Sequence, residues 1–193
     1  MIKKRRIGNT DLEVSELSMG TAPIGGWPVA VNSDQAQKTL NTAWEKGIRY
    51  FDTAPLYGSG MAEKRLGQLL KEKNREEFVV ATKIGRLVIE SATGSNKFKG
   101  QDPNKDTVFD FSYDGTMRSL EESLKRLQLD HVDVLHLHDP DNHPDHLDEA
   151  KKGAIKAMKK LKEEKVVKAI GCGLNQNEML VDLAKEGCFD CFL

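Results

Sequence analysis

The chain has 193 residues, of which 38% are hydrophobic and 31% are charged, so it is long enough for one sizeable core and too short to require two domains. Its 29 lysines and arginines against 30 aspartates and glutamates give a net charge of −1, which excludes the strongly basic surface of a dedicated nucleic-acid-binding protein. No apolar run approaches the roughly 20 residues that span a bilayer, and no signal-peptide pattern follows the basic start of the chain. We therefore expect one domain over residues 1–193, located in the cytoplasm, with a small-molecule substrate and without nucleic-acid or membrane partners.

The chain is predicted to start with a small β-hairpin. The turn-forming residues Gly8-Asn9-Thr10-Asp11 stand between Arg6-Ile7 and Leu12-Glu13-Val14. This hairpin precedes the regular alternation of elements, and we expect it to form a lid.

Apolar runs rich in β-branched residues then alternate with amphipathic helical patterns. The runs predict five strands and the start of a sixth: Leu17–Thr21, Ile48–Asp52, Phe78–Lys83, Val132–His138, Val166–Gly171 and Phe189–Leu193. The helical patterns between them have apolar residues three or four positions apart: Ala36, Leu40, Ala43, Trp44; Ala62, Leu66, Leu69, Leu70; Met117, Leu120, Leu124, Leu127; Ala154, Met158, Leu161. Each helix can cover one face of a sheet.

Helix-capping residues agree with this alternation at the first helix, and one polar segment interrupts it. Asn32 and Ser33 can cap the first helix, and Gly47 can end it. The polar segment Arg86–Tyr113, with two glycines and a proline, is predicted to be a long connecting loop. Loops of this kind often border functional sites.

A repeated strand-then-helix order implies parallel strands joined by right-handed crossovers, in an open doubly wound sheet or in a closed (β/α)8 barrel. The two architectures differ in length, because a barrel usually takes about 250 residues. In the barrel, this chain supplies only the first five strands and the start of the sixth.

Polar and ionisable residues stand at the carboxyl ends of the predicted strands. They are Asp52, Lys83, His138 and Asn175. Tyr57 lies five residues after Asp52, in a short loop that contains proline and glycine. In a βα barrel these strand ends form one rim, so we expect the five side chains to converge there.

The chemistry of these residues suits proton transfer. A phenol has a pKa of about 10, and a neighbouring ammonium such as that of Lys83 favours the phenolate and lowers that pKa. Asp52 offers Lys83 a countercharge, which a buried ammonium requires. His138 can hydrogen-bond a substrate oxygen and orient it towards Tyr57.

Three motifs of the chain resemble those of the aldo-keto reductases, in the family's order and on the same elements. They are FDTAPLYG at 51–58, TK at 82–83 and LHDP at 137–140. Asp52, Tyr57, Lys83 and His138 match the family's catalytic tetrad one by one. FSYDG at 111–115 and RSLEESLKRL at 118–127 further resemble the branch that contains aldose 1-dehydrogenases and pyridoxal 4-dehydrogenases.

The resemblance implies a TIM (β/α)8-barrel type of fold and a nicotinamide cofactor, NADP or NAD, bound without a Rossmann Gly-x-Gly-x-x-Gly motif. It implies interconversion of a carbonyl and an alcohol, on aldoses or small aldehydes, with Tyr57 as proton donor or acceptor. It also implies that Asn175 holds the nicotinamide carboxamide, and that Gly20, Thr21 and Asp52 border the cofactor.

The resemblance runs from about residue 5 to Leu193, so we expect a barrel that lacks its C-terminal part. In the family, the later strands and loops supply the aromatic stacking partner of the nicotinamide and most contacts to the pyrophosphate and adenosine. Uncovered strand edges favour self-association. The first alternative is therefore a non-catalytic fragment that self-associates or needs a partner to complete the barrel.

Histidines and cysteines suggest two further features. All five histidines, His131, His136, His138, His143 and His146, fall within one segment that also holds Asp139, Asp141 and Asp145. This raises a metal-binding alternative, although the spacing matches no structural zinc motif. The chain has three cysteines, an odd number, and we expect them to be reduced thiols.

Overall fold

The computed structural model describes residues 2–94 and 97–193, which form an α/β fold. The helices of this part are α1 (Ser33–Glu45), α2 (Met61–Leu70), α3 (Tyr113–Leu127), α4 (Pro144–Lys152), α5 (Ala154–Glu163) and α6 (Asn177–Lys185). The strands are β1 (Lys4–Arg6), β2 (Glu13–Ser15), β3 (Met19–Gly20), β4 (Tyr50–Asp52), β5 (Val79–Ile84), β6 (Arg86–Glu90), β7 (Lys105–Phe109), β8 (Val134–His138), β9 (Ala169–Gly173) and β10 (Cys191–Phe192).

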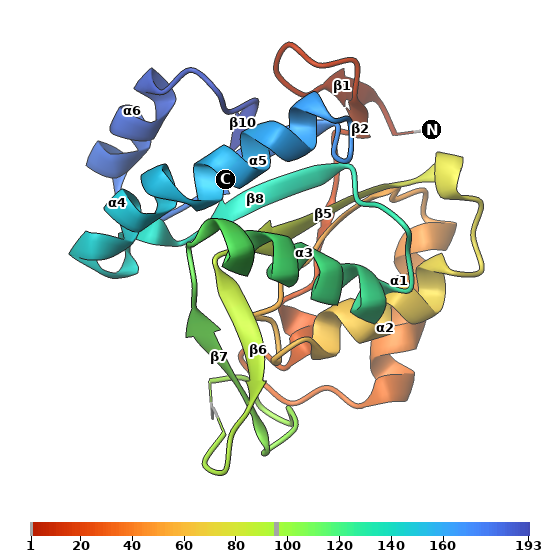
Figure 1. The fold of residues 1–193 in the computed structure, drawn as a ribbon. Coiled ribbons are helices and arrows are strands. Elements are labelled where there is room, and N and C mark those ends of the chain that lie inside the picture. The colour runs from red at the N-terminus through yellow and green to blue at the C-terminus, as the bar shows by residue number, and fades with distance from the viewer. Residues whose placement is uncertain (1, 95–96) are drawn as a thin grey trace.

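The main sheet has the strand order β10-β9-β8-β5-β4-β3, and all of its neighbouring strands pair in parallel. Each new strand is added beside the previous one, so the order never reverses as it does in a doubly wound sheet. The sheet curls like part of a barrel, with helices on its convex side (Figure 1). The predicted βα succession is confirmed, and each predicted strand overlaps a strand of this sheet, although β5 and β9 extend one and two residues beyond the predicted ends.

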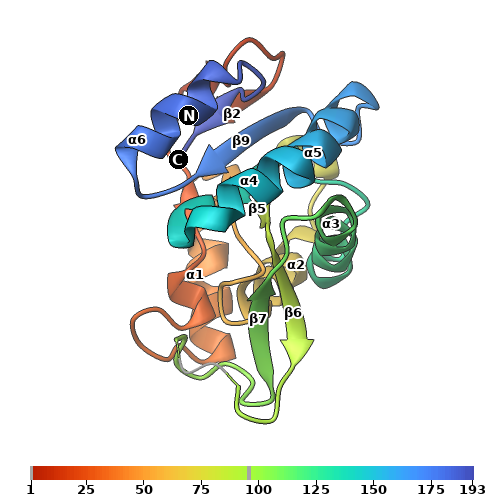
Figure 2. The same cartoon turned by 60° about the vertical axis from the view of Figure 1, so that its left-hand side comes forward.

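The side chains of the strands alternate between two environments. Those on the outer face, including Phe51, Val80, Leu135 and Ile170, are fully buried in the large core cluster against the helices. Helices α1, α2, α3 and α5 pack in succession around this face (Figure 2). The outer face is therefore mostly apolar, with Thr82 of β5 bonded to Glu63 of α2, and the charged residues and histidines of the strands lie on the inner face.

The predicted N-terminal hairpin is confirmed as β1 and β2, which pair antiparallel with Lys4 opposite Ser15. Its apolar residues Ile7, Leu12 and Val14 pack on the inner face towards the amino ends of the strands, against Ala81, Val134 and Ala169. The hairpin is thus a lid over the amino-terminal end of the sheet, and it leaves the carboxyl end open.

The prediction of a long loop over Arg86–Tyr113 is wrong. Strands β6 and β7 form an antiparallel hairpin in which Arg86 pairs with Phe109 and Glu90 with Lys105. A hairpin that is solvated on one side satisfies its backbone hydrogen bonds without a continuous apolar face, so the polar composition did not exclude strands. Figure 1 shows this hairpin at the end of the molecule opposite β1 and β2.

The helix boundaries have local causes. The Asn32 side chain accepts a hydrogen bond of 2.8 Å from the Gln35 amide and caps α1, and Gly47, with φ of 90°, follows the end of this helix, as predicted. Helices α4 and α6 are additions that the apolar periodicity did not predict.

None of the helices in the described ranges combines the length and the apolar character needed to cross a membrane.

Candidate active site

The register of the sheet places three of the predicted site residues on its inner face. Asp52, at the end of β4, pairs with Ala81, and Lys83 stands two positions after Ala81 on β5. Lys83 pairs with His136 on β8, two positions before His138. Because side chains two positions apart share a face, Asp52, Lys83 and His138 all point to the inside at the carboxyl end.

Asp52 and Lys83 form a buried ion pair. The Lys83 Nζ donates to Asp52 Oδ1 at 2.5 Å and to the Thr53 carbonyl at 3.0 Å, and only 1% of the lysine side chain is exposed. A buried ammonium needs such a countercharge. Burial raises the pKa of the Asp52 carboxyl, and Lys83 opposes this rise. Asp52 Oδ2 has no hydrogen-bond partner within the described residues, so it remains available to a ligand.

Tyr57 completes the group from the loop between β4 and α2. The Lys83 Nζ lies 4.9 Å from the centre of its ring, and the ring of His138 stands almost perpendicular to it at a centroid distance of 5.9 Å. The structure therefore brings Asp52, Tyr57, Lys83 and His138 together, as the sequence predicted.

The protonation states differ in part from the prediction. Burial raises the pKa of Tyr57 above its ordinary value, and this effect exceeds the opposite effect of Lys83. The expected net lowering of this pKa is wrong, and Tyr57 is a neutral phenol at pH 7. Burial, followed by the charges of Lys83 and Arg86, lowers the pKa of His138 well below its ordinary value, so that its imidazole is neutral too.

The predicted cofactor-binding residues surround the same rim. Gly20, at the end of β3, has open space where a side chain would stand. Thr21 is fully buried, and its hydroxyl has no hydrogen-bond partner within the described residues. Asn175 is exposed in the loop after β9, where its backbone amide donates to Asp141 Oδ2 at 2.6 Å. Open space beside unsatisfied polar atoms suits a ligand rich in hydrogen-bonding groups, such as a nicotinamide nucleotide.

The sequence did not single out two residues beside this group, Arg86 and Phe98. The Arg86 guanidinium stacks 3.9 Å above the Phe109 ring and donates to Asp139 Oδ2 at 3.3 Å. Phe98 is buried 6.1 Å from the ring centre of Tyr57 and 6.0 Å from that of Trp27. The apolar run at 87–89 was a signal for the strand that carries Arg86, whereas no sequence signal marked Phe98.

The metal-binding alternative is not supported by the arrangement of the histidines. His131 precedes β8, His136 and His138 are inside it, and His143 and His146 stand at the start of α4. Over residues 2–94 and 97–193, no three His, Cys, Asp or Glu side chains are grouped so that they could hold a metal ion. Nearness in the sequence misled here, because β8 separates the ends of this segment. The three cysteines are free thiols.

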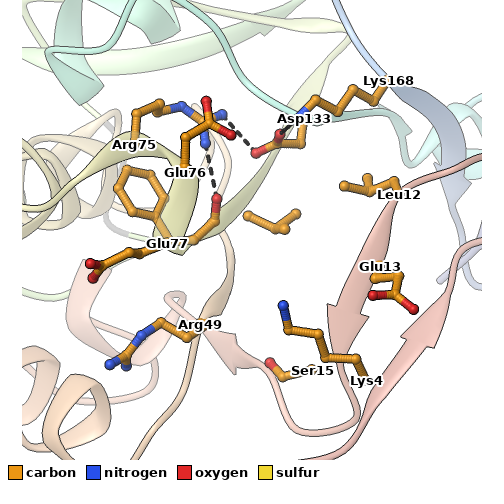
Figure 3. A pocket seen from close by; sticks show the side chains of 12 residues that line it. Lys4, Leu12, Glu13, Ser15, Arg49, Arg75, Glu76, Glu77, Asp133 and Lys168 are labelled. Atoms are coloured by element: carbon orange, nitrogen blue, oxygen red, sulfur yellow. Dashed lines mark hydrogen bonds and ion pairs between the residues drawn. The ribbon is translucent and has the colours of Figure 1, made fainter.

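A small cavity of about 120 Å³ lies at the other end of the sheet, beneath the β1–β2 hairpin (Figure 3). Its wall includes Asp133, which pairs with Arg75 Nη2 at 2.7 Å and with Lys168 Nζ at 2.9 Å. Because four basic and four acidic residues line this cavity, its charges balance, and it has the character of a structural ionic cluster.

Comparison with known proteins identifies the family to which the sequence is similar. The model of the family described as "Aldo/keto reductase family" matches residues 16–188. The chain is 36% identical to pyridoxal 4-dehydrogenase of Microbacterium luteolum, with 99% of the chain and 61% of that protein covered. It is 40% identical to D-threo-aldose 1-dehydrogenase of Pseudomonas sp, with 94% of the chain and 56% of that protein covered. The chain thus spans about six-tenths of the length of these relatives.

Solved structures agree in fold. A putative aldo-keto reductase of Pseudomonas aeruginosa superimposes with a TM-score of 0.73 at 32% identity, covering 98% of this chain and 65% of the other. An aldo-keto reductase of Bacillus halodurans, solved in its holo form, superimposes with a TM-score of 0.74 at 28% identity, covering 96% of this chain and 54% of the other.

Proposed function

The chain belongs to the aldo/keto reductase family, and we propose that it is an NAD(P)-dependent oxidoreductase that interconverts a carbonyl and an alcohol on aldoses or small aldehydes. The observation that carries this proposal is the position of Tyr57, a partly buried neutral phenol packed between Lys83 and His138. The names of the aldose and pyridoxal dehydrogenases among its relatives support the substrate class. We also propose that residues 1–193 form one domain, which is part of a βα barrel.

Each of the four residues has a distinct task in this proposal. Tyr57 gives its proton to the substrate oxygen during reduction and takes it back during oxidation. Lys83 stabilises the phenolate that forms, because its ammonium lies 4.9 Å from the Tyr57 ring centre. Asp52 holds Lys83 in place through their ion pair. His138 hydrogen-bonds the substrate oxygen and orients it towards Tyr57.

The cofactor is proposed to bind at the carboxyl rim, where Gly20 leaves space and Thr21, Asp52 and Asn175 offer polar groups. The hydride of the reaction comes from NAD(P)H, or passes to NAD(P)⁺, when the nucleotide is bound. The holo form of a solved family member supports a bound cofactor in this family.

Replacement of Tyr57 by Phe tests the proposal. It deletes the proton-transferring hydroxyl while the ring that packs against His138 and Phe98 remains. We expect turnover of aldoses to fall about 10² to 10⁴-fold, the range for loss of a general acid or base, with nucleotide affinity unchanged. Steady-state rates and calorimetric titrations with NADP⁺ and NAD⁺ measure both quantities.

A folded chain that binds neither nucleotide, or a Tyr57→Phe variant with full turnover, would contradict the proposal. The molecular mass is determined in the same buffer, because strands β3 and β10 each have one neighbour in the described sheet. Self-association through these edges remains a prediction, and a mass that rises with concentration would support it.

A further inference from the structure

We propose that Arg86 is a positioning residue of the candidate active site, which acts on His138 through Asp139. The inference rests on the proposed function in so far as His138 is assigned to orient the substrate. It concerns a residue outside the Asp-Tyr-Lys-His group, and it rests on how the β6–β7 hairpin is joined to the end of β8.

Arg86 is held in a closed environment. The residue is 7% exposed, its guanidinium lies on the ring of Phe109, and its backbone carbonyl accepts a hydrogen bond of 3.0 Å from the Ser119 hydroxyl of α3. Its Nε is buried with no hydrogen-bond partner in the described part of the chain. Burial of a guanidinium in this way is costly, so it calls for a specific partner.

That partner is Asp139, whose backbone is fixed on both sides. Asp139 adopts the left-handed conformation with φ of 48°, and its amide donates to the Gly173 carbonyl at 2.8 Å. Its own carbonyl accepts from the amide of Asn142 at 3.3 Å and from the Nδ2 of the same residue at 3.1 Å. These bonds place one carboxylate oxygen, Oδ2, 3.3 Å from Arg86 Nη2 and 3.6 Å from His138 Nε2.

A carboxylate at this distance favours the protonated form of an imidazole. Arg86 offsets that effect, because its charge is paired with the same oxygen atom. A neutral His138 can donate a hydrogen bond to a substrate oxygen through its one ring N–H, and this N–H is too weakly acidic to be transferred. An imidazolium beside Tyr57 would be a stronger acid than the phenol and would compete with it as proton donor.

Further charged or titratable groups lie around His138. They are Lys83 on β5 with its ion-pair partner Asp52, His136 on β8, Lys97 between β6 and β7, and Tyr57. Lys83, Arg86, His136 and Lys97 all disfavour the imidazolium. Asp139 is the acidic residue that pairs with the His138 ring, and Arg86 is the cation that contacts Asp139.

The test is a titration of the histidine ring signals by NMR, which requires no enzymatic activity. The His138 signal is assigned from its absence in a His138→Gln variant. In the unmodified chain it should keep its neutral-form shift through the range around pH 6.5 in which an ordinary histidine titrates. In Arg86→Gln the midpoint should rise by about 1 pH unit or more, as expected for an uncompensated carboxylate.

Removal of the carboxylate should cancel the effect. The double variant Arg86→Gln/Asp139→Asn should return the His138 signal to its neutral-form behaviour. The matched control is Arg118→Gln, because Arg118 is an exposed arginine of α3 whose ion-pair partner is Glu122 and not Asp139. This control should leave the His138 titration unchanged.

An Arg86→Gln variant that is folded and shows no rise in the midpoint overturns the proposal, and so does a rise that persists in the double variant. If Arg86→Gln does not fold, Arg86→Lys takes its place, since a compact ammonium cannot reproduce the fork of the guanidinium. A raised midpoint in that variant supports the proposal, and an unchanged midpoint overturns it. Failure of the proposed function appears separately, as a lack of nucleotide binding or of a Tyr57→Phe effect.

Discussion

His136 is a second buried histidine on the inner face of β8. It lies opposite Lys83 in the register, and neither ring nitrogen has a hydrogen-bond partner among the described residues. Burial, with a smaller effect from Lys83, lowers its pKa to about 3. The uncharged ring is tolerated in this position, whereas the imidazolium is not.

This pKa makes the stability of the fold depend on pH. A histidine whose folded pKa lies below its unfolded value of about 6.5 binds more protons in the unfolded chain, so stability falls as the pH drops below that value. For His136 the expected loss is about 1.4 kcal/mol per pH unit, down to the folded pKa of about 3. Urea unfolding of the unmodified chain and of His136→Asn, at pH 7.5 and 5.5, measures the difference.

The His136→Asn variant should lose about 1.4 kcal/mol less than the unmodified chain between these two pH values. His131→Asn is the control, because the side chain of His131 is 36% exposed and lies next to Asp130 outside the sheet. If the unmodified chain and His136→Asn lose equal amounts of unfolding free energy between these pH values, His136 is not the origin of the pH dependence of stability.

The sequence predicted which residues meet at the rim, but not all of their chemistry. Asp52, Lys83 and His138 lie at the carboxyl ends of strands in a parallel sheet, and the topology then brings them together. The pKa of Tyr57 depends on how deeply the ring is buried, and Phe98, which covers it, lies 41 positions further along the chain. A contact of this separation leaves no local pattern, so the net direction of the shift could not be predicted.

At the scale of elements, the segment between β6 and β7 is connected to the site by Phe98. The ring packs with Ala54, Leu56 and Tyr57 of the loop after β4, and the neighbouring Lys99 amide donates to the Gly26 carbonyl at 2.9 Å. Phe98→Ala removes this packing, so the local contact should open more often. We expect amide hydrogen exchange at Lys99 to become about tenfold faster or more, while exchange in β5 and β8 is unchanged.

Val108→Ala provides the control, since Val108 belongs to the same hairpin on β7 but is 40% exposed. Its effect on the Lys99 amide should be small, because little apolar area leaves water at that position. If Lys99 exchanges at the same rate in Phe98→Ala as in the unmodified chain, Phe98 does not hold this segment against the site.

The elements were predictable where they belong to the barrel-type sheet. Short apolar runs such as Val79–Ile84 and Val134–His138 stand out because both faces of these strands are buried. The β6–β7 hairpin is half solvated, and α4 carries a single fully buried residue, Ala150, so neither has the strong periodicity that marks the other elements.

On the scale of the whole molecule, the two ends of the sheet have different roles. The carboxyl end collects the polar residues of the candidate active site, and the amino end is closed by the β1–β2 hairpin and by the ion pairs of Asp133. In βα barrels, catalysis is found at the carboxyl end and stability at the other. The separation predicts that substitutions at the amino end change stability without altering the site.

Asp133 provides the decisive case. Its carboxylate is 1% exposed and pairs with Arg75 and Lys168 (Figure 3). It also accepts a hydrogen bond of 2.9 Å from the Val80 amide, so it joins three segments. Asp133→Asn keeps the shape but removes the charge, so two cations lose their partner. We expect the free energy of unfolding in urea to fall by about 3 kcal/mol, as for other broken buried ion pairs.

The same variant should leave the His138 ring signals unchanged, because Asp133 lies before β8 and His138 lies at its end. Asp130→Asn is the matched control: the side chain of Asp130 is 85% exposed, and its pair with His131 contributes little in water. An Asp133→Asn variant as stable as this control would mean that the charge does not join the strands. A shifted His138 signal would mean that the two ends of the sheet are coupled.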